Sequence, residues 1–274
     1  KNNQEIKSAV REHYATAIKQ KSSCCSPTPA DFDAEAAGRF VAMAGYTSKE
    51  LKSIPSDISS FGCGNPVALA EVKEGQTVLD LGSGAGLDLI LAAGKTGPNG
   101  KVIGLDMTDE MIEVCRANLA KAGIENGEVR RGEMEQMPVG DAEVDWIISN
   151  CVINLSPEKE KVFSESFRVL KPGGQMMVSD IVTDNLPDEY RDDIAAWVGC
   201  IAGAVERKEY IELVKAAGFV DVRIVDELTY NDQTLSVLAN DACGCGPAKT
   251  TVSDESLKKY ANRVASIKLS ARKP

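Results

Sequence analysis

Stretches with strand character alternate with amphipathic stretches through the middle of the chain. Strands are predicted at 77–81, 101–105, 127–131, 144–149, 175–181 and 219–227, with a last strand at 264–270. Apolar positions at helical spacing predict helices at 87–94, 109–122, 158–169 and 187–217, and a short turn is expected near 133–137. This alternation predicts an α/β fold whose parallel sheet is covered by helices on both faces.

The two ends of the chain depart from this alternation. Residues 5–21 predict one amphipathic helix, 22–35 a loop rich in Ser and Pro, and about 34–44 a second helical piece. We therefore predict an N-terminal helical cap at 1–66, a core at 67–228, and a C-terminal extension at 229–274 that contains the last strand. The cap contains Cys24, Cys25 and Cys63, the core contains the Cys200 helix, and the extension contains Cys243 and Cys245.

Composition excludes several classes of function. The net charge of the 274 residues is −10, and no dense Lys/Arg cluster is present, so a nucleic-acid partner is not expected. No apolar run is long enough to cross a membrane, and the first residues have no signal-peptide core. His13 is the only histidine, which argues against a His-based triad or metal site. The eight cysteines are expected to be reduced thiols in the cytoplasm, because a chain of this size forms a core without disulfides.

A glycine-rich turn follows the first core strand. Residues 77–88 read Thr-Val-Leu-Asp-Leu-Gly-Ser-Gly-Ala-Gly-Leu-Asp, which predicts a strand turning sharply into a helix. A P-loop would continue with Gly-Lys-Ser/Thr, and a dinucleotide fingerprint would have Gly or Ala where this chain has Leu87. The turn therefore favours a nucleoside ligand without phosphates.

Acidic residues follow three successive strands. Asp106 ends the second strand, where a carboxylate accepts hydrogen bonds from both ribose hydroxyls, and Glu133 and Glu135 follow the third, near an adenine. Asp80 precedes the glycines and can face a ligand ammonium through water. Each acid alone is equally consistent with a solvated surface charge, but their repetition after successive strands favours a binding site.

In its glycine-rich turn and the residues that follow, the chain resembles the class I S-adenosylmethionine-dependent methyltransferases. The matching residues are Asp80-Leu-Gly-Ser-Gly-Ala-Gly86, Asp106 and Lys171-Pro-Gly-Gly174. The resemblance implies a Rossmann-like, mostly parallel seven-stranded sheet with an antiparallel last strand, an insertion before that strand, and S-adenosylmethionine as cofactor. The implied cofactor-binding residues are Tyr14, Asp80, Gly82, Ser83, Gly84, Gly86, Asp106, Met107, Glu133, Met134, Glu135 and Asn150.

Three cysteines lie at a strand end, in a loop or among small residues, and they are candidates for a substrate-binding site. Cys151 follows the fourth strand, Cys63 lies between two glycines, and Cys200 lies among small residues. Cys115 instead belongs to an apolar helix stripe and is expected to be structural, as free cysteine often is.

Several segments also resemble the arsenite methyltransferases. They are Arg11–Tyr14, Ser23–Cys25, Phe61–Pro66, Ser149–Leu155, Gly199–Ala204 and Val264–Pro274. The resemblance implies that Cys63, Cys151 and Cys200 bind trivalent arsenic as thiolates, with Cys24 or Cys25 as a redox partner. Three thiolates suit this soft ion. The implied substrates are arsenite and methylated trivalent arsenicals as thiol conjugates, the reductant is thioredoxin or glutathione, and the role is arsenic detoxification.

Two other interpretations stay open at this stage. One is a small-molecule methyltransferase whose cysteines are structural, and the other is a thiol-rich metal-binding or sensing protein on a degenerate nucleotide fold. Cys243 and Cys245 match no core motif, and they fit a mobile tail and a soft-ion relay equally well.

Overall fold

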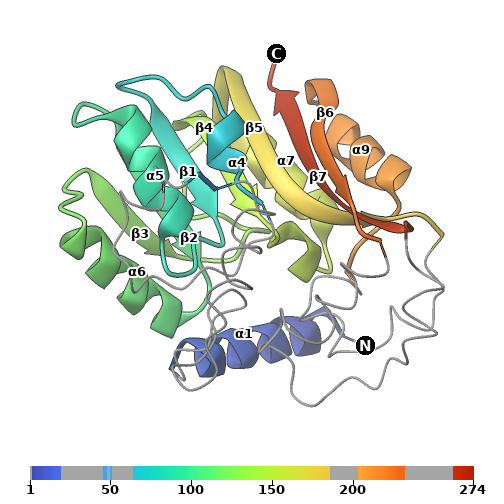
Figure 1. Cartoon of the computed structure of the whole chain (residues 1–274), viewed down its shortest axis with the longest axis horizontal. Coiled ribbons are helices and arrows are strands. Elements are labelled where there is room, and N and C mark those ends of the chain that lie inside the picture. The colour runs from blue at the N-terminus through green and yellow to red at the C-terminus, as the bar shows by residue number, and fades with distance from the viewer. Residues whose placement is uncertain (1, 20–45, 48–49, 51–63, 186–202, 232–261) are drawn as a thin grey trace.

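A seven-stranded sheet forms the centre of the protein (Figure 1). The computed structural model describes residues 2–19, 46–47, 50, 64–185, 203–231 and 262–274. The strand order is β3-β2-β1-β4-β5-β7-β6. The strands are β1 (Thr77–Leu81), β2 (Lys101–Asp106), β3 (Gly127–Arg131), β4 (Val144–Asn150), β5 (Leu170–Thr183), β6 (Val220–Thr229) and β7 (Val264–Arg272). Strands β1 to β5 pair in parallel, whereas β7 lies antiparallel between β5 and β6. The predicted fold class is confirmed.

Helices cover both faces of the sheet. They are α1 (Asn3–Lys19), α4 (Pro66–Leu69), α5 (Leu87–Thr96), α6 (Asp109–Lys121), the 3₁₀ helix η1 (Ile153–Leu155), α7 (Lys159–Val169) and α9 (Arg207–Ala216). Successive side chains of β1 point to opposite faces, so Val78 packs with α5 and α6 while Leu79 packs with α7 and α9. Apolar layers on both faces explain why these strands are almost wholly buried.

Two predicted elements differ from the structure. Strand β5 begins at Leu170, before the predicted start at residue 175, because the backbone at Gly173 and Gly174 pairs with Lys273 although Gly173 adopts φ +78°. The predicted helix over 187–217 is wrong for its residues 203–206, where Val205 accepts a hydrogen bond from Thr183 and α9 begins only at Arg207. The predicted loop at 22–35 and helix at 34–44 lie outside the described residues.

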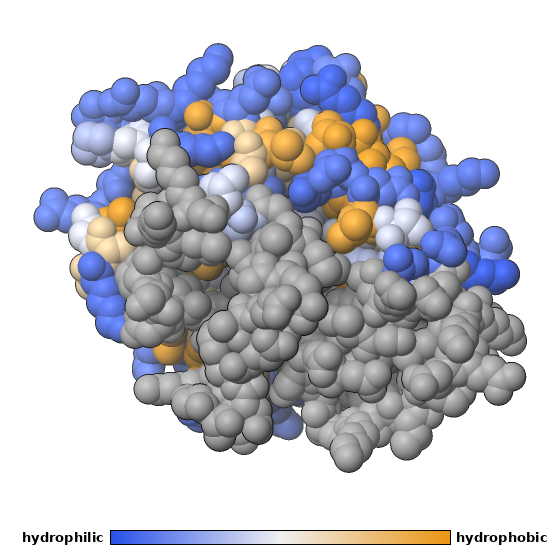
Figure 2. Space-filling view, in the orientation of Figure 1, coloured by the Kyte–Doolittle hydropathy of each residue, from blue (hydrophilic) through white to orange (hydrophobic). Residues whose placement is uncertain are grey.

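Exposed apolar side chains gather on one part of the viewed surface. Figure 2 shows apolar side chains on the part of the surface that includes α4 and β6, bordered by polar side chains. The exposed large apolar residues in the described ranges are Leu69, Val220, Val225 and Leu228. Within those ranges, no helix combines the length and the hydrophobicity that crossing a membrane requires.

Asp180 is a buried carboxylate in β5, only 1% exposed. Tyr210 Oη donates a hydrogen bond to its Oδ2 at 3.0 Å, and the Ile181 amide donates to Oδ1 at 3.0 Å. Burial raises the pKa of Asp180 to about 7, although the positive charge of Lys159 and these hydrogen bonds oppose the rise. The carboxyl is therefore close to half-protonated at neutral pH.

This pKa predicts a pH-dependent effect of Asp180→Asn. A carboxyl whose folded-state pKa is raised from 3.8 to about 7 favours the folded state below pH 4 and loses that contribution as the pH rises to 7. Relative to the native protein, the variant should be stabilised by about 2–3 kcal/mol more at pH 8 than at pH 5. Urea unfolding at the two pH values measures this difference. An equal change in unfolding free energy at both would contradict it.

Candidate functional site

A deep cleft lies at the carboxyl ends of β1, β2 and β4. Its empty volume is about 1000 Å³, open solvent at its mouth included, which is enough for a nucleoside-sized ligand. Parallel α/β sheets bind ligands at this edge. Helix α1 passes along the same edge (Figure 1) and contributes Lys7, Val10 and Tyr14 to the lining.

The glycine turn forms the floor of the cleft. Gly82, Gly84 and Gly86 adopt φ of +62°, +51° and +92°, a region that L-residues with side chains rarely enter. A Cβ on Gly82 would lie 2.3 Å from Val152 Cγ2, and one on Gly86 would lie 2.8 Å from Cys115 Sγ. Glycine is therefore required at both positions for backbone conformation and for space.

Asp106 is held at the end of β2 by the glycine turn. The Gly84 amide donates a hydrogen bond to Asp106 Oδ2 at 3.0 Å, and the Thr108 amide donates to Oδ1 at 2.9 Å. Burial raises the pKa of Asp106, whereas these amide hydrogen bonds lower it. The carboxylate is fixed in orientation, and each oxygen keeps a lone pair available for a ligand hydroxyl.

Asp80 and Asp88 bring two more carboxylates to the cleft. They are 3% and 7% exposed. Burial raises the pKa of Asp80 well above its ordinary value, and repulsion from Asp88 and Asp106 raises it further. Burial also raises the pKa of Asp88 to about 6, although hydrogen bonds from Asn150 and Tyr46 oppose the rise. This wall of the cleft is therefore acidic and favours a positively charged ligand.

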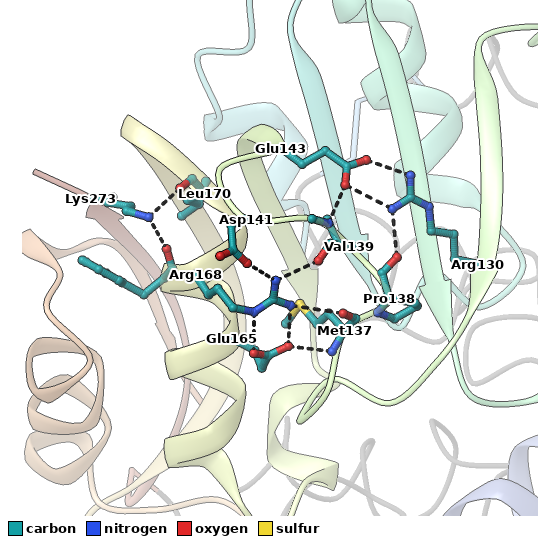
Figure 3. Close-up of polar contacts among 12 residues, drawn as sticks. Arg130, Met137, Pro138, Val139, Asp141, Glu143, Glu165, Arg168, Leu170 and Lys273 are labelled. Atoms are coloured by element: carbon teal, nitrogen blue, oxygen red, sulfur yellow. Dashed lines mark hydrogen bonds and ion pairs between the residues drawn. The ribbon is translucent and has the colours of Figure 1, made fainter.

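The segment between β3 and β4 forms another wall, and helix α7 holds it in place. Figure 3 shows Arg168 in the centre of this contact, where it donates to the carbonyls of Val139 at 2.9 Å and Met137 at 3.1 Å. Glu165 pairs with Arg168 and also accepts a hydrogen bond from the Met137 amide at 2.7 Å. These bonds fix the turn that presents Glu133, Met134 and Glu135 to the cleft.

Cys151 lines the cleft directly after β4. It is 2% exposed and adopts φ +58°, an unusual conformation for a residue other than glycine. Backbone strain of this kind is found disproportionately at functional sites. The expectation of reduced thiols is wrong for Cys151, which is disulfide-bonded in the structure and needs reduction before it can present a thiolate.

Cys115 is buried like Cys151 but does not line the cleft. It is a free cysteine, fully buried beneath the glycine turn. Burial raises the pKa of its thiol to about 12, with further contributions from Asp80 and Asp106. A thiol held in the neutral form is a poor nucleophile and ligand. This agrees with the structural role predicted for Cys115.

Helix α1 is attached to the cleft by Lys7. Its Nζ lies 2.9 Å from Glu133 Oε2, 3.1 Å from Glu135 Oε1 and 3.4 Å from Glu158 Oε2. Ser156 Oγ donates a further hydrogen bond to Glu135 at 2.5 Å. Burial lowers the pKa of Lys7, but the glutamates outweigh it, so the net shift is upward and the side chain is positively charged. One lysine therefore neutralises carboxylates from two separate segments.

Comparisons with known proteins agree with this geometry. Residues 72–218, more than half of the chain, match the family model described as a methyltransferase domain. The solved structure of an arsenic(III) S-adenosylmethionine methyltransferase from Chlamydomonas reinhardtii is 30% identical, with a TM-score of 0.62. The match covers 90% of this chain and 74% of that one. The chain belongs to the arsenite methyltransferase family.

Curated relatives extend the same similarity. The arsenite methyltransferase of Halobacterium salinarum is 42% identical over 82% of this chain, and that of Mus musculus is 31% identical over 86%. The chain spans 61% and 64% of the lengths of these two relatives.

The cleft brings most of the predicted cofactor residues together. Those that line it are Tyr14, Asp80, Gly82, Ser83, Gly84, Asp106, Met107, Glu133, Met134, Glu135 and Asn150. Gly86 does not line the cleft and instead packs against Cys115. Among the predicted thiols, Cys151 lies at the cleft, while Cys24, Cys25, Cys63, Cys200, Cys243 and Cys245 lie outside the described residues. In the part of the chain that the structure describes, no three His, Cys, Asp or Glu side chains form a metal-binding group.

The sequence prediction missed three residues at this site. Lys7, Tyr46 and Asp88 were not predicted as site residues, although Lys7 and Asp88 line the cleft and Tyr46 hydrogen-bonds to Asp88 at 2.7 Å. The sequence offered a signal for Asp88, which is an acidic residue in the first turn of the helix that follows the glycines.

We expect Lys7→Met to loosen α1 from the cleft. Glu133 and Glu135 would lose their shared cation, and removing one partner from a largely buried pair costs about 1–3 kcal/mol here after allowance for partial exposure. Faster hydrogen exchange within α1 would report the loss. Lys19→Met is the matched control, because Lys19 pairs with Glu110 on the exposed side of the same helix. Equal exchange in the two variants would contradict the prediction.

Proposed function

We propose that this protein methylates trivalent arsenic with S-adenosylmethionine. The observation that carries the proposal is the shared cleft, in which Cys151 lines the same cavity as the glycine turn and Asp106. The residues proposed for the donor and the cysteine proposed as a soft-ion ligand thus line one cavity. The names of the relatives at 30–42% identity support the choice of arsenic as acceptor.

The residues of the cleft fit S-adenosylmethionine. Asp106 has lone pairs directed into a nucleoside-sized cavity, as ribose hydroxyls require. The buried carboxylates of Asp80 and Asp88 offset the positive charges of the ligand, which in turn lowers their raised pKa values. Gly82 and Gly84 let the backbone approach the ligand closely. A side chain at these positions would fill that space.

The thiolates of Cys63, Cys151 and Cys200 would bind the arsenical. Arsenic bound to thiolates keeps a lone pair, which attacks the electrophilic methyl that the sulfonium of S-adenosylmethionine supplies. The protein needs no base for this step, so it contributes mainly by positioning, worth at most about 7–11 kcal/mol. The disulfide-bonded state of Cys151 implies that reduction precedes substrate binding.

The proposed reaction also includes a change in the oxidation state of arsenic. Methyl transfer formally oxidises arsenic to the pentavalent state, and two thiols can return it to the trivalent state by forming a disulfide. Cys24 or Cys25 would serve as one of these thiols, and thioredoxin or glutathione would reopen the disulfide. Arsenic detoxification and a cytoplasmic location stay predictions.

Product speciation after incubation with arsenite, S-adenosylmethionine and a dithiol tests the function. Methylated arsenicals should accumulate, with one S-adenosylhomocysteine formed for each methyl group transferred. Binding of S-adenosylmethionine without arsenic binding would favour a small-molecule methyltransferase with structural cysteines. Binding of both ligands without turnover would favour a thiol-rich binding or sensing protein.

A further inference from the structure

A closed loop at residues 132–138 presents its tip, residues 133–135, to the cleft. The Gly132 amide donates a hydrogen bond to the Asp106 carbonyl at 2.9 Å, which ties the start of the loop to the end of β2. The two ends of the loop lie together, because a Cβ on Gly132 would lie 2.5 Å from Pro138 Cδ. A movement at this base of the loop therefore displaces the tip that faces the ligand space.

Two charged side chains of α7 hold the far end of this loop. Arg168 donates hydrogen bonds to the carbonyls of Met137 at 3.1 Å and Val139 at 2.9 Å (Figure 3). Glu165 accepts a hydrogen bond from the Met137 amide at 2.7 Å, and its other oxygen lies 2.7 Å from Arg168 Nε. Both backbone polar groups of Met137 are therefore bound by α7, and the two side chains that bind them orient each other.

Glu165 and Arg168 act on the cleft only through the loop, since neither of them lines it. The side chains of Met137 and Val139 belong to the same apolar core as Phe163 of α7, but apolar burial has little directional preference. Hydrogen bonds are directional, and a guanidinium presents its donors in a fixed fork. The bonds from α7 therefore decide where along the helix the loop is held.

We propose that Glu165 and Arg168 are positioning residues for the adenine of S-adenosylmethionine. By fixing the base of the loop they fix its tip, where the carboxylates of Glu133 and Glu135 are placed to accept a hydrogen bond from the adenine amino group. Each carboxylate keeps lone pairs beyond those that face Lys7. The inference rests on the proposed function for the place of the donor in the cleft, and it requires no arsenic.

Arg168→Met in the full-length chain tests this role through the affinity for S-adenosylhomocysteine, with no acceptor present. We expect calorimetry to show a Kd raised about tenfold, the effect of about one hydrogen bond lost to the ligand. The deamino analogue, in which hydrogen replaces the adenine amino group, cannot form that bond, so its Kd should change by less than about threefold. The preference of the wild type for the adenine ligand should therefore fall. A general loss of folding or of cleft shape would instead weaken both ligands alike.

Arg207→Met is the matched control. Arg207 also forms a bidentate pair, with Glu227 at 2.8 and 2.7 Å, and its side chain is 30% exposed, against 33% for Arg168. It joins α9 to β6, at the edge of the sheet opposite β3, so both affinities should stay within about threefold of wild type. Arg168→Lys keeps the positive charge without the forked donors, and its loss of adenine preference should be smaller than that of Arg168→Met.

Glu165→Gln provides a second variant if Arg168→Met does not fold. Glutamine keeps the size of the side chain and an acceptor for the Met137 amide but loses the charge that pairs with Arg168, so adenine preference should fall in the same direction by a smaller factor. If the Arg168 and Glu165 variants that fold weaken both ligands equally or bind both as the wild type does, the inference is wrong. A wild type without preference for the adenine ligand would also overturn it. A failure to methylate arsenic would overturn the proposed function alone, because the binding test contains no arsenic.

Discussion

Cys151→Ser is expected to abolish arsenite methylation, with a loss of at least about 10²–10³-fold, while S-adenosylmethionine still binds. A serine hydroxyl is a poor ligand for a soft ion, so the arsenic would lose one of its proposed ligands and its alignment with the methyl group. Serine has nearly the same size and retains the backbone hydrogen bond that the Cys151 amide donates to Ser179. The cleft should therefore keep its shape. Product analysis by mass spectrometry and donor binding by calorimetry measure the two effects separately.

Cys115→Ala provides the control for Cys151→Ser. Cys115 is also buried, but its thiol is held neutral beneath the glycine turn. Its loss should cost about 1 kcal/mol of stability from the small cavity and leave methylation within about threefold of wild type. Full methylation by Cys151→Ser would refute the role assigned to Cys151. Equal losses in both variants would point to packing rather than arsenic binding.

Gly82→Ala is expected to weaken S-adenosylmethionine binding about 10–100-fold. The added Cβ would lie 2.3 Å from Val152 Cγ2 and 2.8 Å from Val152 Cβ, so either the glycine turn or the residue after Cys151 must move. Overpacking of this kind costs about 1–3 kcal/mol, and each 1.4 kcal/mol is a factor of about ten in affinity. Val152 lines the cleft, so the displacement falls on the binding surface itself. Calorimetric titration measures the change.

Two further variants separate the steric clash from backbone strain. Gly123 has φ +69°, close to the +62° of Gly82, but no atom lies within 4 Å of the position of an added Cβ. Gly123→Ala should therefore cost about 1–2 kcal/mol of stability with no change in donor affinity. Val152→Ala in the Gly82→Ala background should restore part of the lost affinity. A Gly82→Ala protein that binds the donor normally would show that the turn lies away from the ligand.

Local patterns of apolar residues were enough to predict most strands of the sheet. Apolar alternation and helical spacing placed β1 to β4 within one residue of their observed bounds, because each depends on neighbours in sequence. The antiparallel last strand followed from the resemblance, and β7 occupies that position. The prediction was less accurate at β5, where Gly173 keeps a turn-like φ of +78° inside a strand that pairs with Lys273. Turn residues alone do not reveal that distant partner.

Part of the candidate site could be predicted from local sequence in the same way. The glycine turn is recognisable because it directly follows the strand β1, and Asp106 is recognisable because it is the last residue of the strand β2. Lys7 gave no such signal, since its partners Glu133 and Glu135 lie more than a hundred residues away in the chain. An isolated lysine on an amphipathic helix normally faces solvent, and only the packing of α1 against the cleft directs it inward.

The sequence by itself determined the α/β fold and the nucleoside-type turn, both of which depend on residue type and local spacing. The arsenic chemistry proposed for the cysteines is what the resemblance to a known family implies. Only the tertiary structure decided that Asn150 hydrogen-bonds to Gly64 and Asp88, which are 86 and 62 residues away. It also showed that Cys115 is buried beneath the glycine turn while Cys151 lines the cleft. The physical reason is that burial, pKa and hydrogen-bond partners arise where distant segments meet, and no local pattern encodes them.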